Sequence, residues 1–402
     1  MITLLKRIFK SNGVDKTVYI CVVILTIFGI VMIGSASSGQ AATKGASYAT
    51  INMVKQGAFV LLGFGFMIFL TRCFKKSWIN PTSIWVFYAI GIVSMIVCLA
   101  FSAKGSHAWI KLGPVSIQPA EFMKIAMILL LAFSFGELEE LCQIPKNISR
   151  SKKEELQKRK AWYCLFRPAL AIAVACGVGV FLQKDFGSSV ILGFICIMLF
   201  FITPKPYYKK YKKLVLIAGG ILFVIGILGM AFFLKAYQIA RIHAWLDPLY
   251  DPLNNSMQIA NAMIAFSQGG LLGKGFGASS QKYGYIPESH NDMISAIIYE
   301  ELGFVGFLLF LIPYCIIIYK MFNYAMKIND VKSKLVLYGV AIYFFTHLIV
   351  NVGGVTGLIP MTGVPLLLIS SGGSSTLAAM IAIGVAQSII ARYNRDTLKE
   401  QI

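Results

Sequence analysis

Charged residues are scarce in this sequence of 402 residues. Asp, Glu, Lys and Arg together make up 13% of the chain, and only 17 of these side chains are acidic. Hydrophobic residues make up 57%, and the mean hydropathy is +0.73. A soluble domain of this composition would leave too much apolar surface in contact with water. The composition therefore excludes an ordinary soluble protein and indicates an integral membrane protein.

Metal ligands and disulfide partners are also few. The chain has four His residues, and none of His107, His243 and His290 shows metal-ligand spacing with another His. All eight cysteines fall within predicted spans or inner segments. We therefore expect no disulfide and no zinc site of the CxxC type.

Apolar segments long enough to cross a bilayer recur along the whole chain. We predict one membrane domain over residues 1–402, with ten transmembrane helices and an all-α polytopic fold. The predicted helices cover residues 17–36, 53–71, 82–102, 119–136, 166–182, 188–203, 214–235, 293–319, 336–356 and 374–391.

The basic residues orient this topology. With the N-terminus inside, inner segments hold 27 of the 37 Lys and Arg residues, and outer segments hold 8. This is the asymmetry of the positive-inside rule, and it places both termini in the cytoplasm. The formal net charge of +20 then reflects topology and contact with anionic lipid. No basic face with interleaved aromatics occurs, so we expect no nucleic-acid partner.

Three outer segments are interrupted by Gly and Pro. The longest is a large extracytoplasmic loop between helices 7 and 8, residues 236–292, in which "SMQIANAMIAF" has helical spacing. Its "GKGFGAS" glycines lack the strand–turn–helix context of a nucleotide site and predict a tight re-entrant turn. The apolar segment 351–375 is also broken. Irregular backbone persists at membrane depth only beside protein or a water-lined cavity, so we predict a cavity that opens outward.

Ionisable side chains gather in the outer half of the predicted membrane region, where His347 and Asn351 also lie, toward the end of the ninth predicted helix. Intramembrane charges usually face the bundle interior and mark function. Glu121 and Lys124 are i,i+3 neighbours, and they either neutralise each other for insertion or take part in chemistry. Asp292 is the better candidate for chemistry because it lies at the water boundary. Glu300 and Glu301 lie two turns deeper, and we expect them to be structural.

Three motifs resemble the FtsW/RodA/SpoVE (SEDS) family, and they occur in its order over nearly the whole chain. "AWIKLGPVSIQPAEFMKI" is similar to the family's "RWIxLGPxxxQPSExxKI". "GLLGKGFGASSQKYGYIPESHNDMISAIIYEELGFVG" resembles its "GLxGxGxGxSxQKxxYLPExHTDFIFAxIGEELGxxG". "NVGGVTGLIPMTGVPLLLISSGGSS" resembles its C-terminal signature and is closer to division-type FtsW.

The resemblance implies a peptidoglycan glycosyltransferase that polymerises lipid II at the outer face of the bacterial cytoplasmic membrane, including the division septum. It also implies a class B penicillin-binding protein as partner, among divisome or elongasome membrane proteins. The family's essential Asp falls on Asp292, its Trp on Trp109, and its Glu and Lys on Glu121 and Lys124.

We expect Asp292 to act as the general base that accepts a proton from the acceptor sugar. Lys124 would stabilise the departing pyrophosphate, and a divalent cation, Mg²⁺ or Mn²⁺, would be an alternative. Trp109 would either cover the substrate or anchor the chain at the interface. Further predicted substrate-binding residues are Lys55, Arg241, Lys274, Lys282, Glu288 and His290.

The chain departs from the family pattern near the predicted site. Ala108 replaces an Arg, Asn291 a Thr, Met293 a Phe, Leu367 a Pro and Ser371 a Tyr. Two other classes of function use similar features. A flippase for lipid-linked precursors also needs a polar chamber and a lipid groove, but here the charges gather on one side only. A non-catalytic scaffold would recruit the transpeptidase without needing Asp292.

Overall fold

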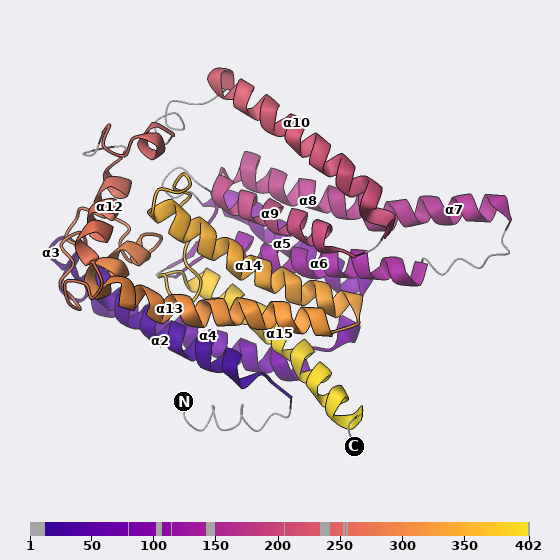
Figure 1. Ribbon diagram of the computed structural model, residues 1–402, viewed down its shortest axis with the longest axis horizontal. Coiled ribbons are helices and arrows are strands. Elements are labelled where there is room, and N and C mark those ends of the chain that lie inside the picture. Colours follow the sequence, from indigo (N-terminus) through magenta and orange to yellow (C-terminus); the bar gives the residue numbers. More distant parts are fainter. Residues whose placement is uncertain are drawn as a thin grey trace.

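The protein is nearly all helical in a computed structural model, which describes residues 13–78, 80–101, 107–113, 115–141, 149–204, 206–233, 242–251, 254 and 256–400 (Figure 1). The helices are α2 (Lys16–Ser38), α3 (Ala41–Lys44), α4 (Tyr48–Cys73), α5 (Pro81–Val97), α6 (Pro119–Leu141), α7 (Arg150–Ala161), α8 (Arg167–Gly177), α9 (Phe186–Ile202), α10 (Lys209–Phe233), α12 (Met257–Gly269), α13 (Ile294–Lys327), α14 (Val331–Val355) and α15 (Gly373–Glu400).

Eight helical segments among the described residues are long and apolar enough to cross a membrane, and α9 is a shorter apolar helix. This confirms the prediction of an all-α polytopic membrane protein. Each of the ten predicted ranges overlaps a helix. The fifth begins earlier than predicted, since Arg150–Leu182 is one continuous helical segment with π-helical turns at Trp162–Phe166 and Val178–Leu182.

The charged first part of that segment, α7, is helical throughout. It extends beyond the rest of the bundle (Figure 1) and buries no side chain. Two i,i+4 ion pairs lie along its surface, Arg150–Glu154 at 3.6 Å and Arg159–Glu155 at 2.9 Å. Such exposed pairs stabilise a helix only slightly, so α7 owes its helicity mainly to strong helix formers.

Burial divides the helices into an inner and an outer set. Of the 18 most apolar consecutive residues in each of α6, α14 and α15, between 72% and 89% are buried. In α4 and α5 the corresponding shares are 22% and 17%. Because lipid chains are as apolar as leucine, α4 and α5 can present Leu, Ile and Phe outward. Small residues let helices of the inner and outer sets approach each other closely. A Cβ on Gly384 of α15 would lie 2.8 Å from the Met67 carbonyl oxygen of α4.

One departure from the all-helical prediction is a β-hairpin between α5 and α6. Its strands, β1 (Ile110–Leu112) and β2 (Val115–Ile117), pair antiparallel with Ile110 opposite Ile117. The hairpin turns at Gly113, which has φ +62°. It leads directly into α6 and places the "QPAEFMK" motif at that helix's first turns.

A polar cluster joins the start of α2 to α13, at the opposite end of α13 from Asp292. Asp15 caps α2, and its Oδ2 accepts from Lys320 Nζ at 2.9 Å and from the Tyr324 hydroxyl at 3.1 Å. Burial raises the pKa of the Asp15 carboxyl, but the hydrogen bond and charge of Lys320 outweigh it. The net effect holds this pKa below its ordinary value of 3.8.

Candidate functional site

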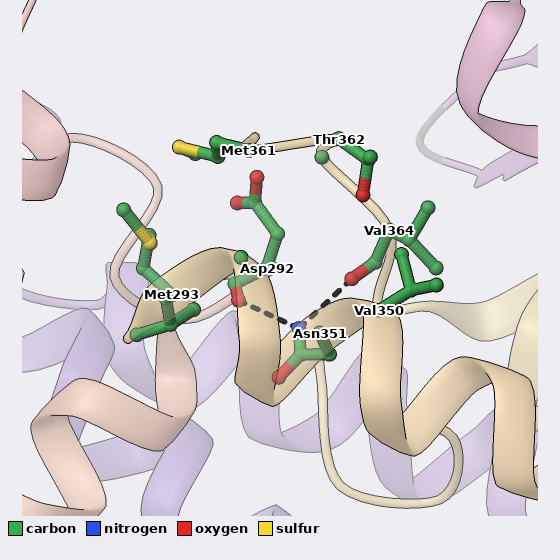
Figure 2. A pocket seen from close by; sticks show the side chains of 10 residues that line it. Asp292, Met293, Val350, Asn351, Met361, Thr362 and Val364 are labelled. Atoms are coloured by element: carbon green, nitrogen blue, oxygen red, sulfur yellow. Dashed lines mark hydrogen bonds between the residues drawn. The ribbon is translucent and has the colours of Figure 1, made fainter. Parts of the chain in front are cut away.

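Asp292 lies at a pocket formed where three elements meet (Figure 2). The residues before α13 supply Asp292 and Met293, and the last turns of α14 supply the second wall. The third wall is the loop between α14 and α15, residues 356–372, which contributes Met361 to Val364. A Cβ on Gly363, where φ is +70°, would lie 3.6 Å from Asp292 Oδ2. The loop backbone therefore closely approaches the carboxylate.

Asn351 joins the three walls. Its Nδ2 donates to the Asp292 carbonyl oxygen at 2.7 Å and to the Val364 carbonyl oxygen at 2.8 Å, as the dashed lines in Figure 2 mark. Its Oδ1 accepts from the Ser295 hydroxyl at 3.3 Å. The Asn351 side chain is buried. One amide thus holds the backbone of Asp292 against the loop that covers it.

A buried polar cluster lies between α6 and α14, one turn of α14 before Asn351. Lys124 Nζ donates to Glu121 Oε1 at 2.7 Å, and these two side chains are 0% and 1% exposed. The Tyr343 hydroxyl donates to Glu121 Oε2 at 3.2 Å, and Lys124 Nζ lies 3.1 Å from His347 Nε2. The predicted i,i+3 pair is therefore formed. Both side chains are almost fully buried, whereas the sequence placed them only in the outer half of the membrane region.

His347 connects this cluster to the pocket. Its Nδ1 lies 3.1 Å from the Pro365 carbonyl oxygen, which can only accept. We therefore assign the proton to Nδ1, which leaves Nε2 to accept from Lys124. Pro365 follows Val364, so His347 and Asn351 hold adjacent carbonyls of one loop.

Tyr343, His347 and Asn351 recur every four residues and form one polar stripe on α14. Sequence reasoning noted His347 and Asn351 at this depth but missed Tyr343. The signal was present, because residues spaced by four lie on one helix face.

The lysines predicted to assist in binding lie in different surroundings. Lys282 is buried, and its Nζ bonds Glu301 Oε1 at 2.9 Å. Lys274 is 30% exposed along its side chain and bonds Glu300 Oε1 at 2.8 Å. Lys55 is exposed on α4, and Arg241 lies outside the described residues.

Two further predicted residues, Glu288 and His290, lie in the segment that leads to Asp292. A third, Trp109, lies directly before the β-hairpin. Glu288 Oε2 accepts from Asn291 Nδ2 at 2.6 Å. His290 is buried beside Tyr48, with ring centroids 5.9 Å apart, and its carbonyl oxygen accepts from the Ser371 amide at 3.0 Å. Trp109 is partly exposed directly before β1. The roles predicted for all these residues stay predictions.

The described part of the chain contains no group of three or more His, Cys, Asp or Glu side chains that could hold a metal ion. The participation of a divalent cation stays a prediction.

Comparison with known proteins identifies relatives over the full length of the chain. Stage V sporulation protein E of Bacillus subtilis is 31% identical over 390 residues, covering 96% of this chain and 99% of that protein. The probable peptidoglycan glycosyltransferase FtsW of the same organism is 31% identical, with 99% and 96% covered. The protein of that name from Geobacter sp. strain M18 is 30% identical, with 95% and 98% covered.

Solved structures share the fold. A chain of a peptidoglycan synthase complex that coordinates polymerization and crosslinking superposes with a TM-score of 0.72 at 23% identity, over 95% of this chain and 98% of that one. The rod shape determining protein RodA of Thermus thermophilus superposes with a TM-score of 0.61 at 20% identity, over 94% and 97%. The family model described as "Cell cycle protein" matches residues 15–395. Since this match spans nearly the whole chain and includes the Asp292 pocket, the chain belongs to the FtsW/RodA/SpoVE family.

Proposed function

We propose that the chain is a peptidoglycan glycosyltransferase that polymerises lipid II into glycan strands. The full-length similarity to proteins named peptidoglycan glycosyltransferase FtsW supports this activity. The observation that carries the assignment to a site is the position of Asp292. Its carboxylate lies at a pocket between α13, α14 and the 356–372 loop (Figure 2). It is also the residue on which the family's essential Asp falls.

In the proposed reaction a glycosidic bond forms between two sugars, and the donor sugar loses its lipid pyrophosphate. The acceptor hydroxyl attacks the anomeric carbon of the donor while the bond to undecaprenyl pyrophosphate breaks. Asp292 takes the hydroxyl proton, which makes the oxygen a stronger nucleophile. Correct placement matters because proximity and orientation supply much of the rate enhancement in such reactions. Asn351 contributes by holding the Asp292 backbone against the Val364 carbonyl.

The departing pyrophosphate needs cationic stabilisation. The Lys124 ammonium is buried and bonded to Glu121 and His347, so its predicted role requires this cluster to open. Lys55 is exposed on α4 and needs no such change, whereas Lys274 would have to leave its ion pair with Glu300. We therefore assign the first contact with phosphate to an exposed lysine. Lys124 would approach the leaving group only in an opened state.

The proposed topology has ten spans, both termini in the cytoplasm, and the Asp292 pocket on the outer side of the bacterial cytoplasmic membrane. The distribution of Lys and Arg supports it. The septum is the proposed location because several relatives are FtsW proteins. The proposed partner is a class B penicillin-binding protein, supported by the likeness to a chain of a synthase complex that coordinates polymerization with crosslinking.

The test compares polymer formation from lipid II by purified wild type, Asp292→Asn and Asp330→Asn. Asp330 caps α14 through the Ser333 amide, a bond that Asn can also accept, so this variant is the matched control. We expect polymer from wild type and Asp330→Asn and none from Asp292→Asn, with all three equally folded. Full polymerisation by Asp292→Asn would remove the base assignment. Translocation of precursor by a wild type that makes no polymer would favour a flippase.

A further inference from the structure

The helix α13 is broken at Gly303, which has φ +64° and ψ −160°. A break there leaves four backbone groups without their helical partners: the carbonyls of Glu300 and Glu301 and the amides of Phe304 and Val305. In a membrane each unpaired group would be costly, because no water is present to replace the lost bond. The break therefore needs another partner.

The loop after α12, residues 270–277, supplies all four missing bonds, and we call it the glycine loop. The Lys274 amide donates to the Glu300 carbonyl and the Gly275 amide to the Glu301 carbonyl, both at 2.9 Å. In return, the Phe304 amide donates to the Gly270 carbonyl at 3.0 Å. The Val305 amide donates to the Leu271 carbonyl at 3.1 Å.

This insertion depends on backbones that approach without side chains between them. A Cβ on Gly303 would lie 2.4 Å from the Gly273 amide nitrogen. A Cβ on Gly273, which has φ +76°, would lie 2.2 Å from the Glu301 carbonyl oxygen. Both glycines are thus required by contact as well as by conformation. The predicted tight turn in "GKGFGAS" is present, and it closes onto a broken helix.

The charged groups at this level are neutralised in pairs. Glu300 is buried and bonds Lys274 of the glycine loop, and it also accepts from the Ser280 amide at 3.0 Å. Glu301 is buried and bonds Lys282, and it also accepts from the Ser35 hydroxyl of α2 at 2.7 Å. Paired charges are the form in which ionisable residues are tolerated at membrane depth.

The glycine loop also presents apolar side chains outward. Leu271 and Leu272 are 72% and 76% exposed, and Phe276 is exposed as well. The two hydrogen bonds from Phe304 and Val305 place Gly270 and Leu271 beside the exposed apolar stripe of α13. That stripe continues through Phe304, Val305, Leu309 and Ile312. The break at Gly303 lies nine residues after the start of α13 at Ile294, about 13 Å along the helix axis.

We propose that the glycine loop is a re-entrant segment whose Leu271–Leu272 tip contacts lipid acyl chains in the leaflet on the Asp292 side. Three observations support lipid as the occupant. The tip is continuous with the exposed apolar stripe of a membrane-spanning helix, and the loop backbone is hydrogen-bonded to the break in α13. The charges beside it are paired.

The experiment places a photoreactive benzophenone amino acid at position 272 of the full chain in lipid nanodiscs and analyses the adducts by mass spectrometry. Position 309, on the apolar stripe of α13, is the positive control. Position 398, exposed near the charged end of α15, is the negative control. We expect lipid adducts at 272 and 309 and none at 398.

A glycine substitution tests whether the break holds the loop. Gly303→Ala should displace the glycine loop, with loss of the lipid adduct at 272 and its retention at 309. Gly65→Ala is the matched control, since a Cβ there meets nothing within 4 Å. Should Gly303→Ala fail to fold, Gly273→Ala serves the same purpose. Absence of lipid adducts at 272 would overturn the proposal, as would dominant cross-links to a second copy or to a co-purified protein. None of these outcomes depends on polymerase activity.

Discussion

Removing the amide of Asn351 should slow polymerisation without weakening substrate binding. Asn351→Ala deletes the two N–H donors that hold the Asp292 and Val364 carbonyls, at 2.7 Å and 2.8 Å, and also the Oδ1 acceptor of the Ser295 hydroxyl. It leaves the Asp292 carboxylate itself in place. The substitution therefore tests whether the position of this carboxylate, rather than its presence alone, determines the rate.

The expected size of the effect follows from the two lost hydrogen bonds to the Asp292 and Val364 carbonyls. Such a bond is worth about 0.6 kcal/mol on average between membrane helices and about 1 kcal/mol in soluble proteins. Two bonds thus stabilise the productive arrangement by about 1 to 2 kcal/mol. Their loss corresponds to a decrease in kcat of about 5- to 30-fold. The KM for lipid II should change little, because the removed amide faces backbone carbonyls.

The assay measures initial rates of glycan formation over a range of lipid II concentrations, together with the thermal unfolding midpoint. Asn394→Ala is the matched control. Its Nδ2 also donates to a backbone carbonyl, that of Gly13 at 2.7 Å, at the opposite end of α13 from Asp292. The reasoning is refuted if Asn351→Ala keeps the wild-type kcat. A loss explained entirely by a smaller folded fraction would also refute it.

Three further outcomes are expected. Lys124→Met should lower the free energy of unfolding by about 3–5 kcal/mol because it leaves the Glu121 carboxylate buried without its cation, and adding Glu121→Gln should restore part of the loss in thermal unfolding. Trp109→Phe should reduce polymerisation modestly if the ring covers substrate, whereas an unchanged rate would identify an interfacial anchor. The lowered pKa of Asp15 means that its bond to Lys320 stabilises the fold above about pH 4 and is lost as pH falls through the folded-state pKa. The unfolding midpoint of wild type should therefore exceed that of Asp15→Asn at neutral pH, and the two should converge in acid.

Much of the site could be anticipated from local sequence. The i,i+3 spacing of Glu121 and Lys124 predicted a pair, and the structure forms it at 2.7 Å. The position of Asp292 before a long apolar run placed it at the mouth of a helix, and it precedes α13 by two residues. These features depend on neighbours along one helix, which the residue spacing fixes.

Other contacts depend on segments far apart in the chain. Asn351 meets a carbonyl 59 residues away, and Lys124 meets His347 across 223 residues. The assignment of Lys282 as a substrate-binding residue rested on its charge alone, and its burial against Glu301 became visible only in the folded chain.

The sequence by itself determined the membrane class, the helical spans and the family, because hydrophobicity, charge asymmetry and motif order are properties of the linear chain. Only the tertiary structure decided which polar groups pair. The break at Gly303 shows the physical reason. A helix can lose two backbone hydrogen bonds in a membrane only where another segment replaces them, and the glycine loop that does so is about thirty residues away along the chain.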